Sequence, residues 1–332
     1  MADTQYGTIS QRTALWAAVE MLDHAQPVLV LSRFGLSKPL PKNKADNVKF
    51  RRPVPFAAAT TPLTEGVAPT AQAMAYEDVA VTIAQYGAVV KITDKVADLC
   101  EDPVLKDATE LCGEQAGATI EALTYAAIRG GTNVFYANGA SRVAVNTKIS
   151  LPKQRAVTRL LKKNKGKKVT KMVAASVNIA TEPVDHAYIA FCHSDCETDI
   201  RDLVGFVPIE KYGTTSKALP YEIGKCEDVR YVCSPDLAPF ADAGGVAGTT
   251  MLTTTGTSAD VYPVIYVSEN SYGLVPLQGA GSITPTVIDP GKPTKDDPLG
   301  QVGYVGWKTW FCALILNQAW LARLEVGATK NA

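Results

Sequence analysis

The sequence predicts an α+β protein built around one long helix and several separate groups of β-strands. Three observations lead to this class. Apolar residues recur at spacings of three and four over residues 102–129, which is the period of an α-helix. Two β-prone runs, 302–316 and 320–326, close the chain and hold three of its four tryptophans. Between these parts, from 172 to 280, short apolar strands alternate with acidic segments.

The composition excludes several classes of protein. The chain has 332 residues, of which 46% are hydrophobic and 20% charged, so a large core can form and global disorder is excluded. Lys plus Arg and Asp plus Glu number 33 each, which argues against a protein whose main role is to grip a nucleic-acid backbone. No apolar run approaches the roughly 18 residues needed to span a bilayer. We expect a soluble protein, made and kept in a cytoplasm, that binds no membrane.

Residues 1–45 are predicted to form an arm. Ser10 can cap a helix that runs to about Asp23 and carries an apolar stripe on one side. Pro27 ends this helix, and the stretch that follows it is rich in Pro, Lys and Asn, with little to bury.

Residues 46–93 are predicted to form a long two-stranded hairpin with a flexible end. The apolar residues of 48–56 share one face of an extended strand, and the prolines in it restrict that strand to a sheet edge. Within 78–92 the apolar face shifts by one residue, and Gly87 stands where a β-bulge would produce that shift. A lone hairpin is only marginally stable in water, so we expect a second surface, such as a neighbouring subunit, to support it.

The clearest predicted helix covers about 27 residues between an N-terminal cap and a pair of glycines that ends it. Asp102 and Pro103 provide the cap and a first-turn proline, and Gly130 with Gly131 ends the helix. At 1.5 Å per residue, the predicted rod is about 40 Å long.

The middle of the chain is divided by charge. Residues 151–172 carry nine Lys or Arg and no acid, whereas 182–236 carry eleven acids and five bases. The basic stretch, 153–171, suggests a nucleic-acid-binding hypothesis, but it has no aromatic residue to stack on bases. A solvated surface helix or an acid-complementary subunit interface is the favoured interpretation.

One constellation offers a candidate for catalysis or metal binding. His186, Cys192, His193 and Cys196 follow one another in a short segment. The ligand spacings typical of structural zinc are missing, and adjacent residues on a strand point to opposite faces, so Cys192 and His193 cannot pair. We favour a structural interpretation, in which Cys192 ends a buried strand and His193 caps the turn that follows. No segment has the residue spacing of a phosphate-binding loop. We expect neither a cofactor nor a metal.

At this point the order of the parts resembles the major capsid protein of tailed bacteriophages, which has the HK97-like fold. The local sequence is similar to the branch of short-tailed N4-like phages. In many relatives the residue after His193 is proline, whereas here it is Ser194. The resembling segments are spread over nearly the whole chain: PLTEGVAP (62–69), QYGAVVKITDKVADL (85–99), EQAGATIEALTYAAIRGGTNVFYANG (114–139), CHSDCETDIRDLVGFVPIEKYG (192–213) and PLGQVGYVGWKTWFCALILNQAWLARLEV (298–326).

This resemblance implies a shell subunit without catalysis. Copies would assemble as pentamers and hexamers into an icosahedral head around double-stranded DNA, which they enclose without sequence-specific binding. The virion would be the final location, after assembly in the host bacterial cytoplasm, and portal, scaffold or decoration proteins are the further partners to consider. The implied division is an N-terminal arm (1–45), an extended loop (46–93), a peripheral domain with the spine helix (94–150 and 275–332) and an α/β axial domain (151–274).

The hairpin supplies the candidate contacts between subunits. An edge strand with an unpaired backbone is a liability in a monomer and becomes useful when a symmetric neighbour covers it. The residues expected to make these contacts are Arg51, Arg52, Val79, Val81, Ile83 and Tyr86. The alternative function is a cytoplasmic metal- or thiol-dependent enzyme that uses His186, Cys192, His193 and Cys196.

Overall fold

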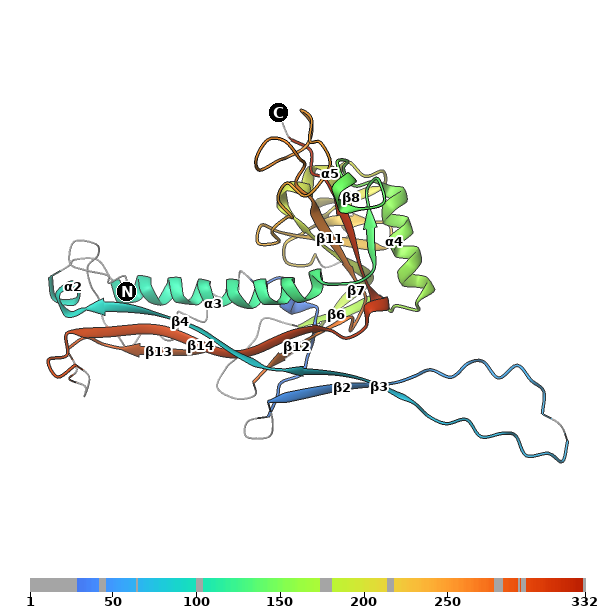
Figure 1. The fold of residues 1–332 in the computed structure, drawn as a ribbon, viewed down its shortest axis with the longest axis horizontal. Helices are drawn as coiled ribbons and strands as arrows, with labels where there is room; N and C mark the ends of the chain where they lie inside the picture. Colours follow the sequence, from blue (N-terminus) through green and yellow to red (C-terminus); the bar gives the residue numbers. More distant parts are fainter. Residues whose placement is uncertain are drawn as a thin grey trace.

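A computed structural model describes residues 29–41, 46–63, 65–99, 104–173, 181–213, 218–277, 283–291, 293 and 297–330 of the chain. Figure 1 shows three parts: a long rod of helix and sheet, a globular part at the C-terminal end of that helix, and a narrow finger that projects beyond it. The predicted helix over 10–23 and the predicted cap at Asp102 and Pro103 lie outside the described residues.

The rod consists of helix α3 lying on a sheet that we call the spine sheet. Helix α3 spans Val104–Arg129, which confirms the predicted long helix and its end before Gly130. The strands of the spine sheet are β1 (Leu36–Ser37), β4 (Ala84–Thr93), β12 (Tyr272–Pro276), β13 (Ile283–Ile288) and β14 (Val302–Ile315). They follow the order β1-β12-β14-β13, and β4 pairs with β14 as well. A short helix, α2 (Asp94–Leu99), follows β4.

One face of the spine sheet packs against α3. Cys112, Ala116 and Ile120 of the helix share a buried cluster with Val305 and Trp307 of β14. The indole Nε1 of Trp307 also donates a hydrogen bond to Gln115 Oε1 at 3.1 Å. The helical spacing of these small and aliphatic residues places them on one side of α3, and the long strand β14 covers that side.

The globular part is built on a second sheet. Its strand order is β5-β15-β11-β7-β10-β9-β8, with β6 paired to β7. The strands are β5 (Val134–Tyr136), β6 (Val169–Val173), β7 (Thr181–His193), β8 (Phe206–Pro208), β9 (Glu222–Cys226), β10 (Val229–Ser234), β11 (Tyr262–Val267) and β15 (Leu321–Val326). Every residue of β10, β11 and β15 is buried.

Helix α4 (Leu151–Lys163) covers the second sheet, and α5 (Glu197–Arg201) lies near its end. Val157 and Leu161 of α4 share a buried cluster with Tyr188 and Tyr231 of the sheet. The Tyr231 hydroxyl lies 2.9 Å from Gln154 Oε1 and 3.1 Å from the Tyr266 hydroxyl, so the polar ends of these buried rings are satisfied. The short 3₁₀ turns are η1 (Leu31–Arg33), η2 (Arg142–Ala144), η3 (Ser194–Cys196), η4 (Ile209–Lys211) and η5 (Gln318–Trp320).

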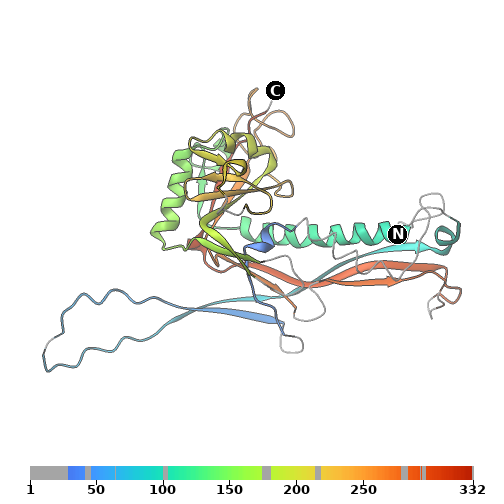
Figure 2. The ribbon, with the colours of Figure 1, turned by 180° about the vertical axis from the view of Figure 1, so that it is seen from behind.

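The finger is formed by β2 (Asn47–Pro53), β3 (Tyr76–Thr82) and the tip between them, residues 54–75. Strands β2 and β3 pair only with each other, as an antiparallel ladder from Asn47↔Thr82 to Pro53↔Tyr76. Figure 2 shows the same projection from behind, well away from the globular part. The hairpin predicted from 48–56 and 78–92 is therefore present, although its paired part is shorter than the prediction.

The predicted single strand with a bulge at Gly87 is wrong. The chain changes sheets at Ile83: β3 pairs with β2, whereas β4 pairs with β14 in a regular register that includes Gly87↔Lys308. The one-residue shift in the apolar pattern therefore marks a change of partner. Gly87 has a different role, because a Cβ atom there would lie 2.5 Å from the carbonyl oxygen of Trp307.

Candidate subunit interface

The tip of the finger exposes apolar side chains that its own chain does not cover. The hydrogen bond from Val54 N to Ala75 O, at 2.9 Å, closes the ladder on the tip side. Beyond it Phe56, Leu63, Val67 and Met74 are 56%, 78%, 65% and 64% exposed. Ten extended residues span about 33 Å, so these side chains are carried far from the body. The sequence analysis placed Phe56 on the apolar face of an edge strand and did not select Leu63, Val67 or Met74, because small residues surround these three and break any periodic pattern.

The base of the finger packs partly on its own chain. Val79, Val81 and Ile83 were expected to contact a neighbouring subunit; Ile83 packs in a cluster with Leu314 and Val275 of the same chain, and Val79 and Val81 are half-buried against that cluster. Ile83 is only 7% exposed. The alternation along the strand correctly identified a buried face, yet it carries no information on which surface buries that face.

Tyr86 is also placed against its own chain. It lies on β4, beyond the finger, and packs against the cluster between α3 and the spine sheet. Of the six predicted contact residues, Arg51 and Arg52 are exposed, whereas Val79, Val81 and Tyr86 are half-buried and Ile83 is buried.

Arg51 and Arg52 make ion pairs across the finger. Arg51 donates two hydrogen bonds to Asp78, at 2.8 and 3.1 Å, and Arg52 Nε donates to Glu77 at 2.7 Å. The hydrogen bond from Arg51 lowers the pKa of Asp78 to about 2. The paired residues stand directly opposite each other in the ladder, so these contacts fix the register of β2 against β3.

A mostly apolar groove lies where the finger leaves the body. One wall is formed by Phe50 and Val79 of the finger, and the other by Leu316 and Trp320. Trp320 is held in place, since its Nε1 donates to the carbonyl oxygen of Asn164 at 3.0 Å. The groove is continuous with the base of the finger.

The face of the spine sheet opposite α3 is a second exposed surface, which bears aromatic and aliphatic side chains together with Lys91 and Lys308. Directly paired residues of antiparallel strands point to the same face, and Tyr304 is paired with Lys91 on one side and Ile288 on the other. Val89 and Trp310 occupy the same face and are 65% and 37% exposed. The buried neighbours of these residues in sequence, such as Val305 and Phe311, point to α3 instead.

The cysteine and histidine constellation has the structural role that the sequence analysis favoured. Cys192 and Cys196 are almost fully buried, and burial raises the pKa of both thiols well above the ordinary value. The backbone N–H of Asp195 donates to His193 Nδ1 at 3.1 Å, so His193 caps the turn Ser194–Cys196.

A protonated buried thiol is a poor nucleophile, so this site does not suit thiol catalysis. His186 lies apart from it, in a charged surface pocket with Lys168 and Asp228. Among the described residues, no group of three or more His, Cys, Asp or Glu is arranged to hold a metal ion.

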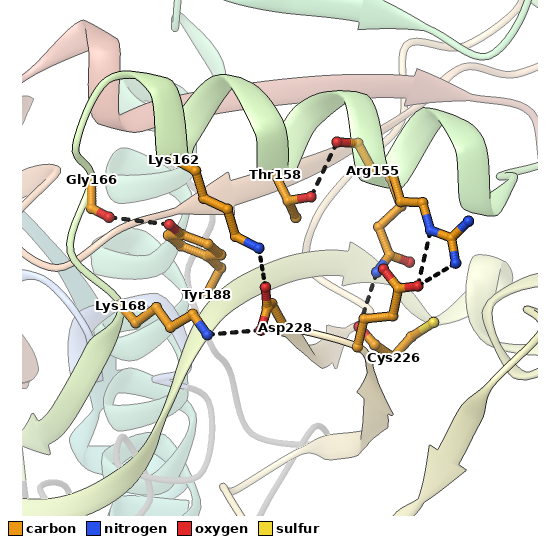
Figure 3. A network of polar contacts seen from close by, with 10 residues as sticks. Arg155, Thr158, Lys162, Gly166, Lys168, Tyr188, Cys226 and Asp228 are labelled. Atoms are coloured by element: carbon orange, nitrogen blue, oxygen red, sulfur yellow. Dashed lines mark hydrogen bonds and ion pairs between the residues drawn. The ribbon is translucent and has the colours of Figure 1, made fainter.

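Three of the nine basic residues of this stretch form ion pairs within the chain. Arg155 Nε donates to Glu227 at 2.9 Å, and Asp228 accepts hydrogen bonds from Lys162 and Lys168, as Figure 3 shows. The hydrogen bonds from the two lysines lower the pKa of Asp228. The pairs of Arg155 and Lys162 attach α4 to the turn between β9 and β10, so the acidic segment of the same chain neutralises part of the positive charge.

No helix in the described ranges has the length and apolar character required to cross a lipid bilayer.

Comparisons with known proteins agree with this geometry. The chain is 22% identical over 181 residues to the major capsid protein of Pseudomonas phage KPP21, a match that covers 51% of this chain and 46% of that protein. The chain thus spans about half the length of this curated relative. The capsid of Ralstonia phage GP4 aligns over 100% of this chain and 95% of its own, with a TM-score of 0.67 and 13% identity. The capsid of cyanophage Pam1 aligns over the whole of both chains, with a TM-score of 0.58 and 17% identity.

These likenesses show that the fold is the HK97-like fold of phage capsids, as the resemblance predicts. The sequence pattern of the phage capsid protein family matches residues 76–313, which is more than half of the chain. That match begins at the first residue of β3 and ends within β14, and so includes α3 and every strand of the second sheet except β15. The chain therefore belongs to the phage capsid protein family.

Proposed function

We propose that this chain is a major capsid protein whose copies assemble as pentamers and hexamers into an icosahedral head around double-stranded DNA. The observation that carries the proposal is the finger, an extended element whose tip bears exposed apolar side chains that its own body does not cover. Such an element is a liability in a monomer and stabilises a closed assembly in which each copy covers part of the next. The proposed role is structural and includes no catalytic step.

We further propose that the tip rests on the uncovered face of the spine sheet of an adjacent copy. Both surfaces are long and narrow, and both present apolar side chains: Phe56 and Leu63 on the tip, and Val89 and Trp310 on the sheet. Strand β14 has 14 residues and therefore extends about 45 Å, which is enough to receive one arm of the tip. Arg51 and Arg52, at the base of the finger, are the proposed polar contacts of the same interface.

The domain division is proposed with one boundary moved. Residues 1–45 are the arm, 94–150 and 275–332 contribute the peripheral domain, and 151–274 form most of the axial domain, whose sheet is completed by β5 and β15. The pairing of β4 with β14 supports an extended loop that ends near Ile83 rather than at 93, because 84–93 are part of the spine sheet.

The proposed phage branch, place of assembly and further protein partners rest on the resemblance in sequence. The segments at 192–213 and 298–326 support the branch of short-tailed N4-like phages. Assembly in the host bacterial cytoplasm, and contacts with portal, scaffold or decoration proteins, are proposed on the same basis. The packaged DNA would meet the inner wall without sequence-specific recognition, in keeping with the balanced charge of 33 basic and 33 acidic residues.

The test is a double variant of the tip, Phe56→Ser with Leu63→Ser, expressed beside the wild-type protein. We expect the variant to keep the thermal midpoint of the wild-type subunit and to form no closed particles in electron micrographs. A matched control is Val204→Ser, since Val204 is as exposed as Leu63, at 78%, but lies on the globular part. Closed particles of the double variant, equal to the wild-type particles in number and size, would contradict the proposal.

A further inference from the structure

A buried carboxylate lies where the end of the arm meets the rod. Glu121 occupies the middle of α3 and is only 1% exposed. Its Oε1 atom accepts hydrogen bonds from the backbone N–H groups of Val30 and Leu31, at 3.3 and 2.9 Å. These partners are about 90 residues away in the sequence, so the contact is purely tertiary. We call residues 29–35, which include the turn η1, the clasp segment.

The clasp segment is held from two sides. The Tyr272 hydroxyl on β12 donates to the carbonyl oxygen of Leu31 at 2.5 Å, opposite the contact with Glu121. Leu31 is fully buried, and the ring of Phe34 packs on Phe191 of β7 with 5.7 Å between the ring centres. The segment therefore contacts α3, the spine sheet and the second sheet together, at the joint between the rod and the globular part.

The second oxygen of Glu121 has no hydrogen-bond partner in the described part of the chain, although it is buried. A buried carboxylate with one oxygen unsatisfied is costly when ionised and much less so when protonated. The two backbone donors need only one carbonyl-like oxygen, which the neutral acid also provides. The geometry thus suits the protonated side chain better than the charged one.

We propose that Glu121 is a proton-controlled clasp: its neutral form holds residues 29–35 against α3, and its ionisation loosens that segment at the joint. The inference concerns contacts within one chain and does not depend on the proposed capsid function.

The charged groups around the clasp agree with this direction. Burial raises the pKa of Glu121 to about 7, against the bonds from Leu31 and Val30, and the negative charge of Asp236 raises it further. Arg33, on the clasp segment itself, lowers it. Tyr272, which faces Glu121 from β12, has its own pKa raised by burial and stays a neutral donor.

The sign of the pH effect follows from this shift. The closed clasp binds the proton more tightly than an opened clasp, in which the carboxyl returns to its ordinary value of 4.5. Opening therefore releases a proton, and the closed state weakens as the pH rises from about 4.5 to about 7. Between pH 5 and pH 8 the opening equilibrium should rise on the order of 50-fold.

The experiment is hydrogen–deuterium exchange of residues 29–35 in the full-length protein at pH 5 and pH 8, with the chemical pH dependence of exchange removed. We expect wild-type protection of the Val30 and Leu31 amides to fall on the order of 50-fold over this range. In Glu121→Gln, whose amide oxygen still accepts both bonds, protection should be the same at both pH values. Glu114→Gln, which changes an exposed carboxylate of the same helix, should keep the wild-type pH dependence.

A further variant keeps the test decisive if Glu121→Gln does not fold. Tyr272→Phe removes the opposite anchor and leaves Glu121 in place, so protection should drop by the same factor at both pH values while the pH dependence persists. A wild-type protein with pH-independent protection, or a Glu121→Gln protein with the wild-type pH dependence, would overturn the proposal.

Discussion

The finger and the second sheet use the same kinds of side chain in opposite ways. In the finger, Arg51 and Asp78 form an ion pair with side chains that are 57% and 31% exposed. In the second sheet, Arg230 and Glu222 form one with side chains that are 2% and 0% exposed. The apolar residues differ likewise, since Leu63 of the tip is 78% exposed and Tyr231 of β10 is fully buried. The second sheet completes its packing within one chain, whereas the tip of the finger leaves its apolar side chains exposed.

The largest expected effect breaks the buried ion pair. Arg230→Ala removes the charge that compensates Glu222, and among the described residues the carboxylate keeps the Tyr212 hydroxyl and the Leu219 backbone N–H as hydrogen-bond partners. An uncompensated buried charge costs about 3–5 kcal/mol of unfolding free energy. Chemical denaturation followed by circular dichroism measures this loss.

The matched control for that variant is Arg51→Ala, which breaks an exposed pair in the finger. We expect no measurable change in the denaturation midpoint, because water solvates Asp78 once the arginine is gone. Equal losses of stability in the two variants would contradict the contrast between the regions.

The next effect separates the base of the finger from its tip. Ile83→Ala leaves a cavity in the cluster with Leu314 and Val275, and should lower the unfolding free energy by about 2 kcal/mol. Leu63→Ala should change it by less than about 0.5 kcal/mol, since the wild-type side chain is already in water. Urea titration of unassembled subunits compares the two. A larger loss for Leu63→Ala would mean that the tip packs on its own chain.

The smallest effect is a pH dependence at the surface of the globular part. Hydrogen bonds from Lys162 and Lys168 lower the pKa of Asp228 below its ordinary value of 3.8. A lowered carboxyl pKa stabilises the fold above 3.8, and that stabilisation is lost as the pH falls through the lower pKa of the folded state. Asp228→Asn should therefore cost less than about 1 kcal/mol at pH 7, because solvent screens the pairs.

Thermal midpoints at pH 7 and pH 2 measure this difference, with 1 M NaCl as the control that screens the pair. The gap between wild type and Asp228→Asn should close at low pH and shrink in high salt. A gap that widens on acidification would show that the lysines do not hold the charged carboxylate.

Much of the fold could be predicted because the signals were local. The period of three and four residues located α3, whose C-terminal end the structure places at Arg129, before Gly130. The β-prone runs near the C-terminus correspond to β14 and β15. The interpretation of His193 as a cap is also confirmed, since a cap depends only on residues one or two positions away.

Predictions that depended on contacts with residues far away in the sequence were less successful. The row Val79, Val81 and Ile83 was recognised as a buried face, but the residues of the same chain that pack against it, Leu314 and Val275, were not foreseen. The exposed apolar residues of the tip were missed, because nothing local distinguishes Phe56 or Leu63 from a core residue. Glu121 gave no signal either, as its partners are about 90 residues away.

By itself the sequence determined the type and order of the elements: an edge hairpin, one long helix, a divided middle and a return of the C-terminus as strands. Helical and strand periods, caps and glycine stops act over a few residues, so they can be recognised without coordinates. Only the tertiary structure decided that the chain changes sheets at Ile83, that the basic helix α4 is paired with Glu227 and Asp228, and that the tip is left uncovered. The physical reason is that periodicity says which face of an element leaves water, and the partner that covers it is chosen by contacts between residues far apart in the chain.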